Sequence, residues 1–311
     1  MSSQTILWIA FGIVVPVVLA LDLGVFQRKA HTIKAKEALI GTAAYISLAL
    51  IFAVAVYFML DREHAFTFLT GYIVELSLSV DNLFVFMLIF SSFCVPSNYQ
   101  HRVLFWGIIG AVVTRGIFIA SGLAILEALH WVIYVFGAFL VYTGIKIATK
   151  KEEGEVDPKK NILFRLGCKY LPVVDEYRGG KFFSRENARM MATPLFLVLL
   201  VVESTDIMFA VDSIPAILSI TQDSFLIYTS NIFAILGLRS LYFALAHATN
   251  RLVYLNYGLA AILVLLGIKM LGSSWFHVPV AVSLGSIVSI LGITAAASLL
   301  WPPKKKDIIS R

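Results

Sequence analysis

Apolar residues fill nine stretches of the chain, and short polar segments separate most of them. The stretches lie at about 4–25, 38–60, 66–92, 103–126, 131–149, 192–219, 225–247, 252–271 and 278–301. Most of them reach the ~20 residues that a helix needs to cross ~30 Å of hydrocarbon. The alternating ten-residue segments typical of outer-membrane strands are absent from the sequence. The pattern therefore predicts an all-α integral membrane protein with about nine transmembrane helices.

The composition supports this class, because 59% of the residues are hydrophobic, only 14% are charged and the mean hydropathy is +0.87. We expect residues 1–311 to form a single transmembrane domain, in which 150–191 is the one sizeable polar loop. The first stretch is expected to be retained, since MSSQTILW lacks the basic residues that begin a signal peptide.

The positions of Lys and Arg predict the orientation. Most of the 25 basic residues fall in loops on the same side as 150–191 and the C-terminal tail, whereas Arg62 is in a loop on the other side. Positive charge accumulates in cytoplasmic loops. We therefore expect a bacterial-type inner membrane protein with its N-terminus outside and its C-terminus and the 150–191 loop in the cytoplasm. The net charge of +6 then faces anionic lipid, and we expect no nucleic-acid partner.

Two similar acidic motifs lie inside apolar stretches: ELSLSVDN at Glu75–Asn82 and DIMFAVDS at Asp206–Ser213. Each motif places two carboxylates in hydrocarbon. A charged side chain near the membrane centre costs at least about 2.5–3.5 kcal/mol, so such residues are functional candidates by default.

The same residues follow each motif in the same order. Arg115 and then GIK at 144–146 follow the first motif, and Arg239 and then GIK at 267–269 follow the second. We therefore predict two related three-helix units, at about 66–149 and 192–271. A unit with an odd number of helices reverses its orientation at its second occurrence, which gives the inverted repeat found in many secondary transporters.

Six acidic residues within or bordering the spans face two permanent cations, Arg115 and Arg239. The acids are Asp22, Glu75, Asp81, Glu203, Asp206 and Asp212. Protons or a metal ion must neutralise the excess negative charge. Carboxylates with Asn82 and Ser213 beside them indicate a hard cation, Mn²⁺, Ca²⁺ or Mg²⁺. We expect this ion as transported substrate, with no permanently bound cofactor.

The two acids of one motif are six residues apart, so on a straight helix they point about 120° away from each other. We therefore expect Asp81 and Asp212 to be the ligands and Glu75 and Asp206 to complete the pathway. Pro215 is expected to kink or break the helix beside Asp212, which would free a carbonyl for the ion.

Each candidate also has a structural interpretation. Arg115 and Arg239 are expected to pair with carboxylates of neighbouring helices and hold the bundle together. Asp22 lies near the inner surface, where pairing with a basic residue is as plausible as ligation. Glu203 either carries a proton or acts as a structural cap to Asp206, three residues further along the same helical face.

Longer segments around these residues resemble the TerC family, and within it the Alx-like members. The segments are ALDLGVF at 20–26, GYIVELSLSVDNLFVF at 71–86, YVFGAFLVYTGIK at 134–146, ESTDIMFAVDSIPAI at 203–217 and TSNIFAILGLRSLYF at 229–243. The resemblance covers nearly the whole chain. It implies export of a metal ion, Mn²⁺ in the Alx-like members, through the positions of the six acids. The family name implies an association with tellurium resistance.

Residues and resemblance together predict a secondary transporter rather than an enzyme. It would bind Mn²⁺ between the two units and export it from the cytoplasm against protons. Two alternatives remain. An intramembrane aspartyl hydrolase also needs paired Asp residues on separate helices, and a tellurium-resistance-associated scaffold would recruit other membrane proteins through the 150–191 loop.

Overall fold

The computed structural model describes most of the chain, with gaps mainly in the loops and the C-terminal tail. The described residues are 2–26, 35–129, 131–149, 172–174, 176–186, 189–248, 254–273, 275 and 278–300. Within these ranges the side chains of 22–26, 81, 84, 88, 127, 186, 189, 211, 212, 247, 248, 255, 256, 280 and 299 lie outside the description.

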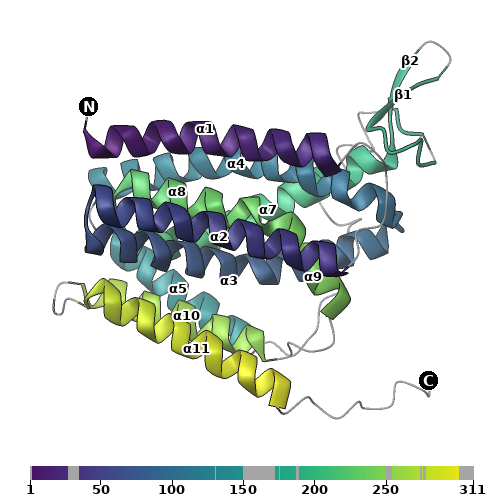
Figure 1. Ribbon diagram of the computed structural model, residues 1–311. Coiled ribbons are helices and arrows are strands. Elements are labelled where there is room, and N and C mark those ends of the chain that lie inside the picture. Colours follow the sequence, from purple (N-terminus) through teal and green to yellow (C-terminus); the bar gives the residue numbers. More distant parts are fainter. Residues whose placement is uncertain are drawn as a thin grey trace.

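Helices fill the nine predicted apolar stretches (Figure 1). They are α1 (Ser3–Phe26), α2 (Ala35–Met59), α3 (Arg62–Ser92), α4 (Ser97–Ala128), α5 (Val132–Thr149), α7 (Pro194–Leu218), α8 (Ser224–Leu236), α9 (Leu238–Ala248), α10 (Leu255–Leu271) and α11 (Val280–Leu300). Seven of the described helices are long and apolar enough to cross a membrane, and α8 with α9 makes up to eight. The described part of α10 is shorter. The predicted all-α membrane fold is confirmed.

Acidic residues cap the N-termini of two helices, α3 and α8. The carboxylate of Asp61 accepts a hydrogen bond of 2.8 Å from the backbone N–H of His64 and caps α3. Asp223 caps α8 in the same way, accepting from the N–H of Phe225 at 2.8 Å. Such caps satisfy backbone donors that have no partner inside the helix.

The helices run side by side, and the N-terminal end of α1 and the C-terminal end of α11 lie at opposite ends of the bundle (Figure 1). One large apolar core joins α1, α2, α3, α4, α7, α8 and α9, and a second joins α3, α5, α7, α10 and α11. Helices α3 and α7 belong to both cores. α8 is buried on nearly every side, as expected for a helix that is apolar all round and is enclosed by other helices. The two acidic motifs therefore lie on helices at the centre of the molecule.

The expected break of the helix beside Asp212 is wrong, whereas the alternative expectation of a kink there stays a prediction. α7 continues through Pro215 to Leu218. Pro215 stands in the last turn of α7, where the missing N–H removes only one bond of the ladder. The interruption lies instead at Gly237, where α8 and α9 meet at a bend of 41°, two residues before Arg239.

A short hairpin in the predicted cytoplasmic loop was not expected. Strand β1 (Phe183–Glu186) pairs antiparallel with β2 (Arg189–Ala192), with Phe183 opposite Ala192. The hairpin lies at the end of the bundle away from the N-terminus (Figure 1). The hydroxyl of Tyr177, which lies ahead of β1, donates a 2.7 Å hydrogen bond to the carbonyl of Phe93 at the end of α3. This bond attaches the loop to the helices.

Helices α5 and α10 approach each other through glycines, which allow close contact between backbones. A Cβ at Gly267 would lie 2.7 Å from the carbonyl oxygen of Gly137, and a Cβ at Gly144 would lie 2.7 Å from that of Ala260. If the two GIK segments correspond, Gly137 corresponds to Ala260 and Gly144 to Gly267. The two contacts are then the same contact with the partners exchanged, as a twofold relation requires. This packing is consistent with the predicted inverted repeat, whose boundaries stay a prediction.

Substitution of Gly267 tests this backbone contact. We expect Gly267→Val to lower the stability of the bundle by about 1–3 kcal/mol, since the new side chain must displace the backbone of α5. Gly285→Val on α11 is the matched control, because no atom lies within 4 Å of a Cβ built there. Thermal unfolding of the purified variants in detergent measures both effects, and equal Tm values for the two variants would contradict the described contact.

Candidate functional site

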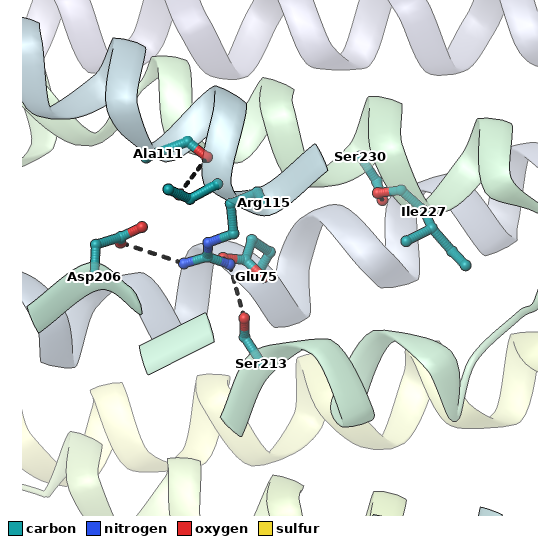
Figure 2. Close-up of polar contacts among 8 residues, drawn as sticks. Glu75, Ala111, Arg115, Asp206, Ser213, Ile227 and Ser230 are labelled. Carbon is teal, nitrogen blue, oxygen red and sulfur yellow. Dashed lines mark hydrogen bonds and ion pairs between the residues drawn. The ribbon is translucent and has the colours of Figure 1, made fainter. Parts of the chain in front are cut away.

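Arg115 lies at the centre of a buried polar cluster between α3, α4 and α7 (Figure 2). Its guanidinium is completely buried. One terminal nitrogen, Nη1, donates to Oε1 of Glu75 and, at 2.7 Å, to Oγ of Ser213. The other, Nη2, lies 3.5 Å from Oδ1 of Asp206. We call these four residues the Arg115 cluster.

The cluster joins the two predicted repeat units. Glu75 is the first acid of the motif on α3 and Asp206 the first acid of the motif on α7, while Arg115 belongs to α4. Glu75 is 1% exposed and Asp206 5%. Charges this far from water are tolerated only when they are paired and hydrogen-bonded. One guanidinium here faces two carboxylates, so full ionisation leaves an excess negative charge in the bundle.

Several polar atoms in and beside the cluster have no hydrogen-bond partner, although they are buried. They are Oε2 of Glu75, Oδ2 of Asp206, Nε of Arg115 and Oγ of Ser79, which lies one turn after Glu75 on α3. Buried polar groups in proteins are nearly always satisfied by protein, water or an ion. Each carboxylate therefore offers one oxygen to a further partner.

A small cavity lies beside the cluster. Glu203, Asp206 and Arg239 contribute its charged side chains, and Ala111 and Ile235 are among its apolar walls. Its volume of about 20 Å³ is close to the room that one water molecule occupies. The Glu203 carboxylate lies against the α4 backbone at Gly110, where a Cβ would overlap it. A glycine at this position thus makes room for an acid from α7.

The structure brings some of the predicted site residues together and leaves others apart. Glu75, Asp206, Ser213 and Arg115 form the cluster, and Glu203 and Arg239 line the adjacent cavity. Asn82 is buried in α3. The side chains of Asp22, Asp81 and Asp212 lie outside the described part, so their ligand roles stay predictions.

Among the described side chains, no three His, Cys, Asp or Glu gather in a way that could hold a metal ion. Glu75 and Asp206 are engaged with Arg115 instead, and Glu203 packs against Gly110. A metal site on the described residues would therefore need neutral oxygen ligands or a rearrangement of the Arg115 cluster.

Sequence reasoning missed three residues of this region. Ser79 is an ordinary helix residue by composition, and Gly110 is one of several glycines in α4. Asn231 lies in an apolar stretch of α8, is 0% exposed, and has no hydrogen-bond partner for either amide atom. An Asn surrounded by apolar residues in a predicted span is the one signal that could have identified the last of these.

Comparison with known proteins assigns the family. Residues 60–306 match the integral membrane protein TerC family. The chain belongs to the TerC family. The matched range contains all four residues of the Arg115 cluster.

Relatives of this TerC-family protein match it along nearly their whole length. An uncharacterized membrane protein of Myxococcus xanthus is 49% identical over 94% of this chain and 92% of its own. Alx of Escherichia coli strain K12, described as a putative membrane-bound redox modulator, is 44% identical over 93% of this chain and 92% of its own. The Salmonella typhi protein of the same name is 43% identical, over 97% and 96%. No solved structure matches the chain.

Substitution of Arg115 tests whether its positive charge stabilises the cluster. We expect Arg115→Leu to destabilise the protein by roughly 3–5 kcal/mol, because it leaves two buried carboxylates without their counter-charge. Adding Glu75→Leu should recover part of the loss. Thermal unfolding in detergent measures both variants, with Arg62→Leu as the control at an exposed position. A Tm for Arg115→Leu equal to that of the control would show that the ion pairs do not stabilise the fold.

Proposed function

We propose that this TerC-family protein is a secondary transporter that exports a divalent cation, Mn²⁺ first among them, from the cytoplasm in exchange for protons. One observation carries the proposal. Carboxylates of both acidic motifs meet at Arg115 inside the bundle, and each keeps one unpartnered oxygen. Intramembrane ionisable residues that face a bundle interior are characteristic of ion and proton pathways.

The charge balance of the region favours cation exchange. Three ionised acids in this region, Glu75, Asp206 and Glu203, carry more negative charge than the two arginines, Arg115 and Arg239, carry positive charge. Asp81 and Asp212 add to this excess. Either protons or a divalent cation restore neutrality. Oxygen donors without Cys or His suit Mn²⁺, Mg²⁺ or Ca²⁺. In the proposal the ion passes two sets of ligands on its path: Asp81 and Asp212 with Asn82 and Ser213, and the second oxygens of Glu75 and Asp206 beside Arg115. Glu203 carries a proton beside the cavity.

The Arg115 cluster also suggests how binding couples to movement. Arg115 ties α4 to α3 of one predicted unit and to α7 of the other. Protonation of Glu75 or Asp206, or a cation at their second oxygens, weakens the attraction of the carboxylate for the guanidinium. The proposed exchange thus loosens the contact between the two units, which is the step that alternating access requires.

Transport in everted membrane vesicles tests this function. We expect Asp81→Asn, Asp212→Asn and Glu75→Gln each to reduce Mn²⁺ uptake at least about tenfold, which corresponds to 1.4 kcal/mol in binding or barrier. Glu63→Gln, an exposed acid in the first turn of α3, is the matched control and should transport normally. A pH-sensitive dye should report proton movement only when the cation is transported.

Membrane insertion of every variant is checked first by its amount in the vesicle membrane. Normal Mn²⁺ uptake by either aspartate variant would exclude the assigned ligands. Wild-type vesicles that take up no divalent cation would exclude the function itself, and the scaffold and hydrolase alternatives would then take its place.

A further inference from the structure

Asn231 has two buried side-chain atoms without a hydrogen-bond partner, more than any other described residue of the bundle. It stands in the middle of α8, is 0% exposed, and neither its amide nitrogen nor its amide oxygen has a hydrogen-bond partner. In hydrocarbon an unpaired amide costs several kcal/mol, because no water replaces the missing bonds. Such a residue in a native protein calls for a partner of another kind.

Its polar neighbours along α8 differ from it in this respect. The hydroxyl of Thr229 donates to the carbonyl of Phe225 at 2.7 Å, and that of Ser230 donates to the carbonyl of Ile227 at 3.2 Å. Both hydroxyls are thus satisfied within their own helix. The amide of Asn231 makes no such bond within the helix. Among these three neighbouring polar residues of α8, only Asn231 therefore lacks a hydrogen-bond partner.

The helical spacing places Asn231 in line with the cavity. Asn231, Ile235 and Leu238 are separated by four and three residues and therefore share one face of the helix. Ile235 and Leu238 line the cavity that Glu203, Asp206 and Arg239 also line. Asn231 is thus one turn beyond the cavity, on the face that borders it.

Helix α4 brings Arg115 to the same level as Asn231. α4 runs antiparallel to α8, since Ala111 and Ile235 line one cavity while a Cβ at Gly116 would lie 3.2 Å from the ring of Tyr228. One turn beyond the cavity α4 therefore carries Arg115, and α8 carries Asn231. On α3, a Cβ at Gly71, one turn before Glu75, would lie 2.7 Å from Oγ of Ser230.

We propose that the amide oxygen of Asn231 is a ligand of the transported cation, next to the unpartnered oxygens of Glu75 and Asp206. The inference rests on the proposed function and adds a third helix, α8, to the two that carry the other ligands, α3 and α7. Amide oxygens are hard, neutral ligands for Ca²⁺, Mg²⁺ and Mn²⁺. Asn231 adds affinity without adding negative charge, so the carboxylates remain free to exchange protons for the ion.

Cation binding to the purified full-length protein tests the proposal, with Mn²⁺ alone as the probe in isothermal titration calorimetry. We expect Asn231→Leu to weaken Mn²⁺ binding at least about tenfold, and Asn231→Asp, which keeps an oxygen at the same place, to bind as well as wild type or more tightly. Thr229→Val is the matched control, because it removes a buried hydroxyl of the same helix whose bond is internal.

Thermal unfolding without added cation separates ligation from a structural role. Asn231→Leu should keep or raise the wild-type Tm, since an apolar side chain replaces an unpaired amide. Asn231→Leu with wild-type Mn²⁺ affinity would overturn the inference and leave the proposed function intact. Wild-type protein that binds no Mn²⁺ would overturn both. If Asn231→Leu does not fold, the Mn²⁺ affinity of Asn231→Asp alone tests the inference. A tenfold loss of Mn²⁺ affinity in Asn231→Asp would contradict the role of the side-chain oxygen as a ligand.

Discussion

The interaction of Arg115 with the carboxylates of Glu75 and Asp206 determines how the centre of this protein is built. Three charged groups are buried inside the bundle, away from bulk water, and pair with one another. Their helices, α3, α4 and α7, are therefore fixed relative to one another by charge as well as by apolar packing. The remaining helices surround this centre, and the glycine contact of α5 with α10 brings the third helices of the two predicted units together.

The same interaction limits what the site can do. Arg115 occupies one oxygen of each carboxylate, which leaves the second oxygen of each as a ligand and keeps a permanent positive charge within reach. A cation that binds there must compete with the guanidinium. Reversible competition of this kind suits a transporter, where the ion must be released again, better than a permanently bound metal. A neutral ligand such as the amide of Asn231 fits the same requirement.

Part of this arrangement could be predicted from the sequence. Hydrocarbon imposes a minimum length on each span, so the nine apolar stretches predicted the helices. The excess of buried acids over Arg115 and Arg239 predicted that the arginines would pair with them, and the structure shows ion pairs of Arg115 with Glu75 and Asp206. The choice of partners required the tertiary structure, because α4 alone does not reveal which acids lie beside it.

Other features were not predicted from the sequence, each for a different physical reason. Pro215 suggested a break in α7, yet its place in the last turn leaves the helix continuous, and the bend occurs at Gly237. The β1–β2 hairpin follows from pairing within a loop that has no hydrophobic pattern. Asn231 stands out in the sequence only as an Asn in an apolar stretch, and its burial without a hydrogen bond becomes visible only in the structure.

In the proposed transporter, oxygens around Arg115 bind the transported ion. Anomalous diffraction from crystals of the full-length protein grown with Mn²⁺ tests it most directly. We expect an anomalous peak within coordination distance of Glu75, Asp206 and Asn231, between α3, α7 and α8. An Mn²⁺ peak elsewhere in the bundle, with the oxygens around Arg115 left without metal, would contradict it.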